Sequence, residues 1–289
     1  MNREKEFKNQ LLKWSKDNTR KYSWRNTKDP WKIYLIEIIA QKTQLYRADQ
    51  YYKKFIKKFP NPKAMSKSTK REILEMWSGL GYNIRAVRMF ESSKILAKRS
   101  FDTIYPYFEV LPGVGSYTND ALLSFAYGEK VITKDTNVLR IFSRFFRVEN
   151  PEKFILKNQK NLLKNVHSRK FNQALMDFGA KVCTSKKPLC NVCVLEPNCQ
   201  KFIQYKKQTQ PGFKGSDREI RGKIIKYLIN KRGWLQCKFL FTTRTAKIIY
   251  IPIKFIGVRC IFRINKHLTN RINFFLFMLN IYNNLLFLI

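Results

Sequence analysis

The stretch from Leu111 to Arg140, LPGVGSYTNDALLSFAYGEKVITKDTNVLR, constrains the fold more than any other part of this sequence. It opens with Leu111-Pro112-Gly113-Val114-Gly115, where two glycines and a proline allow a hairpin too tight for residues with a β-carbon. Residues 116 to 126 are predicted to form the helix that follows. The hairpin therefore presents backbone N–H groups at a helix N-terminus, where orphan donors and the helix dipole favour an anion such as phosphate.

Asp135 lies about twenty residues further on, just before a segment with helical apolar periodicity (Val138, Leu139, Ile141, Phe142 and Phe145). A carboxylate at this position is commonly an N-cap, and it can also be a catalytic group. Both interpretations stay open at this point, and the choice between them depends on the other groups that the fold brings near.

The charge of the chain predicts a polyanionic partner. Fifty-seven Lys and Arg residues against 20 Asp and Glu residues give a net charge of +37, with 15% aromatic residues. Nucleic acid is the leading candidate. The alternative is a solvated basic surface, or the residue bias of an AT-rich genome. The N-terminus MNREKEFKNQ lacks the apolar region of a secretory signal, so we expect a cytoplasmic, nucleoid-associated protein.

Glu37 is a lone carboxylate in the predicted helix from Trp31 to Thr43, within the apolar run YLIEIIA. Burial without a cation disfavours the ionised form, so such a glutamate can hold a proton near neutral pH and act as a general acid. The alternative is a polar stripe that faces water. Gln41 and Gln44 share its helix edge, and this edge is a candidate for lining a cleft.

A second glycine turn, Gly79-Leu80-Gly81-Tyr82, follows a helix predicted over residues 66–77. Tyr82 beside Arg85 and Arg88 is suited to stacking on a nucleic-acid base. The alternative is a tyrosine packed under the end of the helix.

Four of the six cysteines fall within seventeen residues, with the spacing C-x6-C-x2-C-x5-C at Cys183, Cys190, Cys193 and Cys199. In a reducing compartment such crowding favours metal binding over disulfides. One short knuckle with a single cysteine on either side suits a loop around an iron–sulfur cluster better than the paired knuckles of structural zinc. Both a redox and a structural role are compatible with this pattern.

The chain changes character after residue 205. Residues 211–217 read as a linker, residues 218–231 as an amphipathic helix, and IIYIPIKFIGV as a strand-like segment. Residues 272–289 carry no charge but contain four asparagines, so we expect an unstructured or aberrant tail, with a membrane anchor as the alternative.

Three motifs in this order, LPGVGSYT, KDTNVLR and the four cysteines, resemble the helix-hairpin-helix base-excision DNA glycosylases that carry a [4Fe–4S] cluster. The resemblance covers about residues 5 to 205. It is strongest to the glycosylases that remove mismatched adenine, through Trp24-Arg25, DPWKIYLIEIIAQKTQ and GLGYNIRA. It implies an all-α, two-lobed fold. Residues 25–134 would form a helical-barrel lobe, residues 1–24 with 135–205 a cluster lobe, and residues 206–289 a linker, short helix and atypical tail.

The chemistry of base removal gives the candidate residues their roles. Breaking an N-glycosidic bond builds positive charge on the sugar and negative charge on the base, so it needs a carboxylate near one and a proton donor near the other. The resemblance implies that Glu37 is the acid and Asp135 the stabilising carboxylate. It further implies DNA contacts and a base pocket from two sets of residues: Gln41, Lys42, Gln44, Tyr82, Leu111, Gly113, Val114, Gly115 and Tyr117 for DNA, and Trp24, Arg25 and Trp31 for the pocket.

Tyr117 stands where endonuclease III has its Schiff-base lysine, so the resemblance implies a monofunctional glycosylase. Lys134, beside Asp135, is a candidate for weak strand cleavage. The expected partner is double-stranded DNA with a mismatch or damaged base. We expect the protein to bind it as a monomer and to have no membrane as a partner.

Two departures bear on specificity. Lys42 replaces a neutral glutamine that probes the opened helix in the adenine enzymes, and neither His167 nor His267 belongs to the Phe-Ser-His triplet of their 8-oxoguanine recognition domain. Adenine opposite guanine or 8-oxoguanine is the predicted substrate. The alternatives are a thymine or uracil glycosylase acting on T·G or U·G, and a non-catalytic DNA-binding module.

Overall fold

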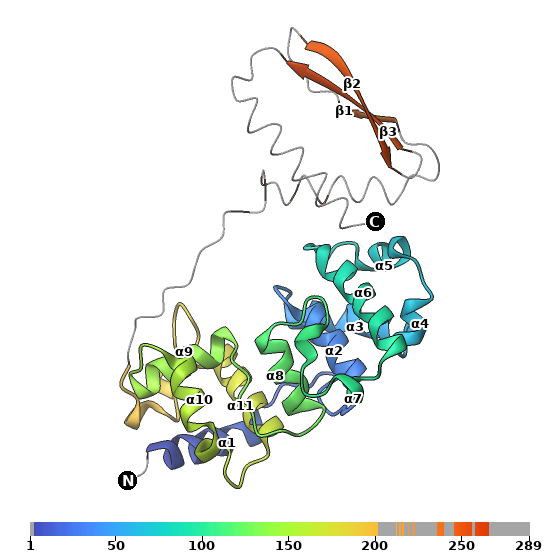
Figure 1. Ribbon diagram of the computed structural model, residues 1–289. Coiled ribbons are helices and arrows are strands. Elements are labelled where there is room, and N and C mark those ends of the chain that lie inside the picture. The colour runs from blue at the N-terminus through green and yellow to red at the C-terminus, as the bar shows by residue number, and fades with distance from the viewer. Residues whose placement is uncertain are drawn as a thin grey trace. The chain divides into compact units, whose positions relative to one another are not determined.

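The computed structural model describes residues 3–201, isolated positions between 212 and 222, and the backbone of three strands within residues 236–265. Residues 3–201 are helical, as predicted (Figure 1). The helices are α1 (Arg3–Asn18), α2 (Pro30–Ala40), α3 (Leu45–Lys58), α4 (Pro62–Ser66), α5 (Lys70–Trp77), α6 (Ile84–Lys98), α7 (Phe101–Ile104), α8 (Ser116–Phe125), α9 (Thr136–Phe146), α10 (Pro151–Leu162) and α11 (Ser168–Lys181), with the short turns η1 (Phe108–Val110), η2 (Cys190–Val192) and η3 (Glu196–Asn198).

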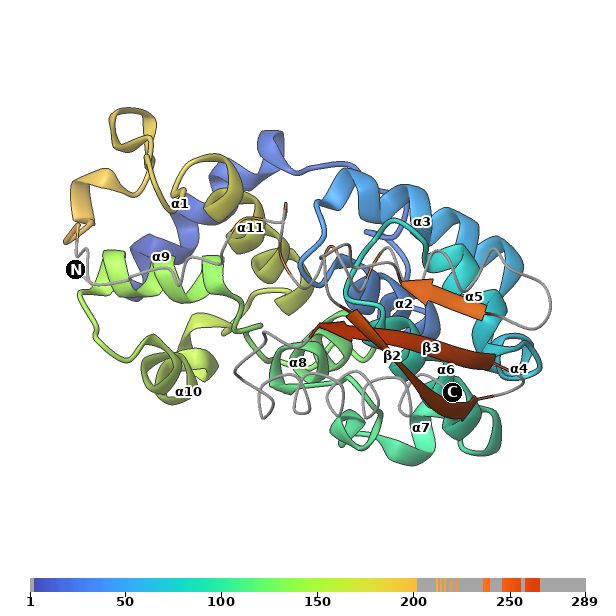
Figure 2. The same cartoon turned by 90° about the horizontal axis from the view of Figure 1, so that it is seen from above.

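The chain divides into two compact units, Met1–Ser68 with Arg88–Gln210 and Thr69–Val87 with Pro211–Ile289. In the first unit, α1 packs against α10 and α11, α9 against α10 and α11, and α2 against α3 and α8 (Figure 2). The predicted lobe boundaries at residues 25, 134 and 205 stay a prediction.

Helix α2 is the most apolar helix of the first unit, and its start is locally encoded. The Asp29 carboxylate accepts hydrogen bonds from the backbone N–H groups of Trp31 and Lys32, and Pro30 occupies the first helical position. The helix ends at Ala40, three residues earlier than predicted: the backbone leaves the helical region at Gln41, with ψ 118°, and Lys42 follows in a left-handed conformation with φ +55°. Glu37 therefore lies in the last turn and a half of α2.

The predicted glycine hairpin precedes α8. Gly113 has φ +87°, and a β-carbon there would approach the Arg88 side chain to 3.3 Å. The Val114 N–H donates to the Leu111 carbonyl across the turn. Gly115 is the N-cap of α8 and provides no side-chain cap, so backbone donors of the first turn stay open at an exposed site.

A core cluster holds α1, α9, α10 and α11 together. Its fully buried aromatic members are Phe7, Phe142, Phe145, Phe171 and Phe178, and Phe7 lies with its ring centroid 4.8 Å from that of Phe145. Cys183, Cys193 and Cys199 pack against the edge of this cluster. The apolar periodicity after Asp135 is thus the face that α9 turns into the core.

Buried Asn172 of α11 fixes the segment that leads to Asp135. Its side chain accepts a hydrogen bond from the Thr133 N–H and donates to the Ser124 hydroxyl and the Val131 carbonyl. An asparagine with 0% exposure that satisfies three partners specifies one arrangement of that segment.

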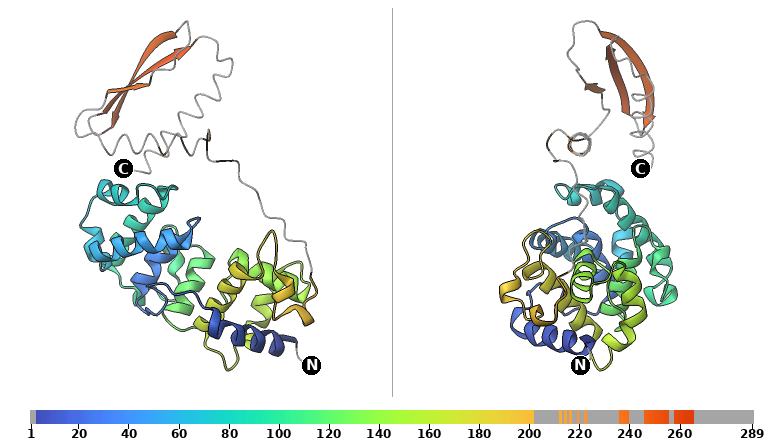
Figure 3. Two further views of the ribbon diagram at one scale, coloured as in Figure 1. Left: turned by 180° about the vertical axis from the view of Figure 1, so that it is seen from behind. Right: turned by 90° about the vertical axis from the view of Figure 1, so that its left-hand side faces the viewer.

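The second unit contains α5, the turn over residues 78–83, the start of α6 and three strands. The helix predicted over 66–77 is α5, which begins four residues later at Lys70, because Thr69 caps it by accepting from the Glu72 N–H. The strands β1 (Gln236–Phe239), β2 (Ala246–Phe255) and β3 (Val258–Asn265) form a sheet of order β1-β3-β2, with β1 parallel and β2 antiparallel to β3 (Figure 3).

The segment IIYIPIKFIGV, predicted to be strand-like, supplies most of β2. Alternating and β-branched residues of this kind favour extended pairing. Most of the predicted helix over 218–231 and the uncharged stretch 272–289 lie outside the described residues. Among the helices that the structure describes, none is long and apolar enough to cross a bilayer.

Candidate active site

Glu37 is surrounded by protein on α2 but keeps part of its side chain accessible. Burial raises its pKa from 4.5 to about 7. A hydrogen bond from Tyr117 and the positive charge of Arg25 oppose this rise, whereas the nearby charge of Asp135 adds to it. With this pKa, the Glu37 carboxyl group keeps its proton to higher pH than an ordinary glutamate does.

Asp135 is the N-cap of α9. One carboxylate oxygen accepts from the Val138 N–H at 2.6 Å, and the other accepts from the Asn137 side-chain amide at 3.2 Å. Burial raises the Asp135 pKa, while these hydrogen bonds and Arg140 lower it. The cap interpretation is confirmed by this geometry. It does not exclude the other interpretation, because Asp135 also bears electrostatically on Glu37 and Tyr117.

Tyr117 lies on the first turn of α8, is hydrogen-bonded to Glu37 and feels the charge of Asp135. Burial and the charges of Glu37 and Asp135 raise the pKa of its hydroxyl well above the ordinary value. The hydroxyl thus stays neutral and donates to Glu37. Residues from α2, α8 and the start of α9, distant in the sequence, meet at one point.

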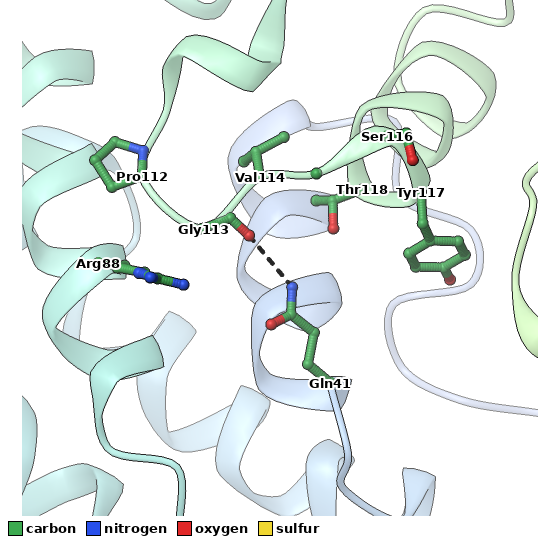
Figure 4. A pocket seen from close by; sticks show the side chains of 9 residues that line it. Gln41, Arg88, Pro112, Gly113, Val114, Ser116, Tyr117 and Thr118 are labelled. Atoms are coloured by element: carbon green, nitrogen blue, oxygen red, sulfur yellow. Dashed lines mark hydrogen bonds between the residues drawn. The ribbon is translucent and has the colours of Figure 1, made fainter. Parts of the chain in front are cut away.

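A recess of about 680 Å³ opens beside this group (Figure 4). It is lined by Gln41, Arg88 and residues 112–118. The Gln41 amide donates to the Gly113 carbonyl at 3.4 Å, so α2 and the hairpin meet here. Lys42 and Gln44, the other predicted DNA contacts on this edge, are exposed.

The hairpin divides into supporting and exposed residues. Leu111 is 1% exposed and Val114 is 8% exposed, so these side chains support the turn from inside and are not free to contact DNA. Gly115 and Ser116 are exposed at the N-terminus of α8. An anion would meet backbone donors here rather than apolar side chains.

The three residues predicted for a base pocket have different surroundings. Trp24 is half-buried and stacks on Tyr22, with ring centroids 4.5 Å apart and an interplanar angle of 8°. Arg25 is 9% exposed, and its guanidinium is bound by Asp177. Trp31 is 3% exposed and its indole N–H donates to the Phe59 carbonyl, so it is part of the interior.

Lys134, the residue considered for strand cleavage, does not point freely toward a ligand. Its ammonium group forms a short ion pair with Asp120 of α8, and both side chains are largely buried. The amine must leave this pair before it can react as a nucleophile.

Tyr82 in the second unit is 40% exposed, with φ +48°, between Gly81 and Asn83. The Arg85 guanidinium lies 5.7 Å from its ring centroid and 4.8 Å from that of Trp77. An exposed aromatic ring beside a cation is the arrangement that the stacking interpretation requires.

The four cysteines lie in the loop after α11 and are free thiols. Cys190 is exposed, and the other three are partly buried. Burial raises the Cys193 pKa to about 11, and the charges of Cys183, Cys199 and Cys190 add to this rise, so the four sulfurs lie within electrostatic range. Within the described residues, no group of three or more His, Cys, Asp or Glu side chains is arranged to hold a metal ion.

Helix α9 connects the cysteine loop to Asp135. Arg140 donates to the Cys183 carbonyl at 2.9 Å and to the Asn137 side-chain oxygen at 2.8 Å, and Asn137 in turn donates to Asp135. Gly179 allows α11 to lie this close to Asn137 of α9, since a β-carbon on Gly179 would come within 2.7 Å of the Asn137 β-carbon.

Sequence reasoning missed Asn137, Arg140 and Asp177. For Asp177 a signal existed, because it is the only carboxylate in the apolar segment FNQALMDFGAK, as Glu37 is in its own helix. Asn137 and Arg140 carried no such signal, since their roles depend on partners in another helix.

Known proteins match this chain over the same region. Residues 35–164 match the family described as HhH-GPD superfamily base excision DNA repair protein. An adenine DNA glycosylase of Buchnera aphidicola subsp. Baizongia pistaciae is 37% identical over 209 residues, which cover 69% of this chain and 59% of the relative. That of subsp. Acyrthosiphon pisum is 34% identical over 244 residues, which cover 80% of this chain and 69% of the relative.

Among solved structures, a thermostable thymine-DNA glycosylase superposes with a TM-score of 0.64 and 28% identity, covering 69% of this chain and 96% of that chain. The helical fold, the hairpin and the paired carboxyl groups thus define a helix-hairpin-helix base-excision protein. The chain belongs to the HhH-GPD superfamily of base excision DNA repair proteins and, within it, to the adenine DNA glycosylase family. It spans 59% of the length of the first of these relatives.

Proposed function

We propose that this chain is a monofunctional DNA glycosylase that hydrolyses the N-glycosidic bond of adenine mispaired with guanine or 8-oxoguanine. The observation that carries the proposal is the pair of Glu37 and Asp135 around Tyr117, one carboxyl group with a pKa of about 7 and the other capping α9. Two carboxyl groups in different environments are what an acid and a stabilising base require. The similarity to adenine DNA glycosylases supports adenine as the base.

Glu37 is the proton donor in this mechanism. It protonates adenine at N7 as the C1′–N9 bond breaks, so the bonding electrons leave with a neutral base. The Asp135 carboxylate stabilises the positive sugar, and water adds to C1′ and gives its proton to Asp135. The products are free adenine and an abasic site, so one water molecule is consumed in each cycle.

Strand cleavage is expected to be absent or weak. The hydroxyl of Tyr117 occupies the position of the Schiff-base amine, and the amine of Lys134 is engaged by Asp120. Hydrolysis by water is the route that these residues leave open.

The DNA is held from several elements in this proposal. Backbone donors at Gly115 and Ser116 bind a phosphate, while Gln41, Lys42 and Gln44 reach the opened duplex, and Tyr82 enters the stack beside the mispair. Unstacking costs a few kcal/mol and is least costly at a mispair, which contributes to selectivity. The protein acts as a monomer on double-stranded DNA, at the nucleoid.

The cysteine loop is proposed to hold a [4Fe–4S] cluster through Cys183, Cys190, Cys193 and Cys199. The donor chemistry fits, because three of the four cysteines pack at the edge of the core, the charge of the exposed Cys190 also acts on Cys193, and a metal would stabilise the thiolates that burial disfavours. When bound, the cluster would fasten the loop that Arg140 and Arg144 contact from α9. Purified protein should be brown, with broad absorbance at about 400 nm. Colourless protein with stoichiometric zinc would refute this assignment.

A thymine or uracil glycosylase acting on T·G or U·G is the second candidate, favoured by the similarity to a thymine-DNA glycosylase structure. Lys42 also departs from the adenine enzymes, which have a neutral glutamine at this position to probe the orphan base, so this residue does not favour adenine over thymine or uracil. Single-turnover assays on duplexes with A·8-oxoguanine, A·G, T·G and U·G distinguish the two. Release of adenine from the first two duplexes is expected, whereas release only from T·G and U·G would show that the adenine proposal is wrong.

A non-catalytic DNA-binding module is the candidate from another class. The same assay addresses it, because such a module would bind all four duplexes and release no base. Duplex binding measured in parallel separates this outcome from an unfolded sample.

A further inference from the structure

One face of helix α8 carries three polar residues about one turn apart. Tyr117, Asp120 and Ser124 follow one another at i, i+3 and i+7, so they form a single stripe along the helix. The Tyr117 hydroxyl is hydrogen-bonded to Glu37 of α2. Asp120 and Ser124 contact the segment that leads to Asp135, the first directly and the second through a side chain of α11. The stripe thus meets the proton donor at one end and this segment further along.

Consecutive residues of the segment are attached to the stripe one after the other. Thr133 donates from its backbone N–H and its hydroxyl to the Asn172 side-chain oxygen at 3.0 and 3.3 Å, and the Asn172 amide donates to the Ser124 hydroxyl at 2.9 Å. The next residue, Lys134, donates from its ammonium group to the Asp120 carboxylate. The chain therefore runs along the stripe toward the N-terminal end of α8, and the residue that follows is the N-cap of α9.

The ion pair of Lys134 and Asp120 is largely buried, with side-chain exposures of 14% and 12%. Taking two charges out of water costs about as much as their attraction returns, so an apolar pair of similar volume is often as stable or more stable. A charge-assisted hydrogen bond is nevertheless directional, whereas an apolar contact is not. What this pair contributes beyond an apolar contact is therefore the position of the two groups.

We propose that Asp120 is a positioning residue for the catalytic carboxylate: by binding Lys134, it fixes the adjacent Asp135 relative to α8 and to the proton donor on α2. The inference deepens the proposed function, on which it rests, by naming the contact that sets the separation of acid and carboxylate. Lys134 and Asp135 are joined by one peptide bond, so movement of the lysine moves the cap. A misplacement of about 1 Å can cost about 10²-fold in rate.

Two variants separate position from stability. Asp120→Asn leaves a buried ammonium group without this carboxylate, so single-turnover base release should fall by about 10- to 100-fold while duplex affinity stays near that of wild type. Asp120→Leu combined with Lys134→Met replaces the ion pair by an apolar pair. The double variant should match the Tm of wild type but not its rate, because the apolar contact does not fix the segment. It also decides the question if Asp120→Asn fails to fold.

Amide hydrogen exchange gives a second readout, which requires neither DNA nor turnover. The Val138 N–H donates to the Asp135 carboxylate at 2.6 Å, so its exchange reports how firmly the cap is held. In the double variant, exchange at Val138 should be faster than in wild type, while exchange at Phe142 in the core of α9 should be unchanged. Lack of base release from every duplex would refute the proposed function, whereas exchange at Val138 decides this inference separately.

Lys53→Gln is the matched control for Lys134→Gln. Each variant removes one lysine from an ion pair with an aspartate, but Lys53 pairs with Asp49 on the exposed side of α3. Lys134→Gln should lower the rate as Asp120→Asn does, whereas Lys53→Gln should keep the wild-type rate. A wild-type rate in Asp120→Asn would overturn the proposal. Recovery of both the rate and the slow exchange of Val138 in the double variant would also overturn it, because the pair would then be structural only.

Discussion

Replacing Glu37 by glutamine should make the protein more stable at alkaline pH while removing its acid. The folded carboxyl group has a pKa of about 7, against 4.5 for the ordinary side chain. Between these two values the folded state binds more protons than the unfolded state, so the free energy of unfolding of the wild type falls as pH rises. Glutamine does not titrate and avoids this loss.

The magnitude follows from the size of the shift. A rise from 4.5 to about 7 corresponds to at most about 3 kcal/mol of stability that is present below pH 4.5 and lost by about pH 7. Because part of the Glu37 side chain is accessible to solvent, the measured difference should be smaller. Even half of this value would be a large fraction of the stability of a typical domain.

The assay is urea denaturation of wild type and Glu37→Gln at several pH values from about 5 to about 8. The glutamine variant should gain stability relative to wild type as pH rises through this range, and the difference should level off above about pH 7. Base release by wild type should fall over the same range, since only the protonated acid donates. A stability difference that does not change with pH would refute the assignment of Glu37 as a buried acid.

Three further predictions concern the site and the tail. Asp135→Asn should lower base release by about 10³-fold or more yet bind duplex DNA almost as wild type, because asparagine can still cap α9; unchanged release would remove Asp135 from the mechanism. Tyr117→Phe removes a hydrogen bond that lowers the Glu37 pKa, so the pH profile of base release should move to higher pH; a profile that moves to lower pH would contradict this. Truncation after Gln210 should leave base-excision activity, and complete loss in a folded truncation would show that the tail is needed.

Several features of the site could be predicted because their causes are local in the chain. The glycine spacing of the hairpin, the cap at Asp135 and the apolar run around Glu37 each depend on residues within one turn of a helix. The four cysteines gather for the same reason, since they lie within one short loop. Helix ends were less predictable, as the end of α2 at Ala40 shows, because the conformations of one or two residues, here Gln41 and Lys42, decide where a helix stops.

Other features depend on pairs of residues that no local pattern connects. Asp177 meets Arg25 across 152 positions of sequence, and Arg140 reaches Cys183 across 43. Trp31, predicted to line a pocket, is instead buried with its indole bound to the Phe59 carbonyl. Such contacts arise from which helices pack together, and helix packing depends on whole faces rather than on single residues.

By itself, the sequence determined the elements, their caps and the types of chemical group available for catalysis, since these depend on spacing and on side-chain chemistry. The tertiary structure decided which of these groups act together. The pKa of Glu37 rises to about 7 because α3 and α8 pack on its helix and burial disfavours the ionised carboxyl group, with the charge of Asp135 adding to the rise. Desolvation and the field of neighbouring charges are properties of the packed protein, and neither exists in the extended chain.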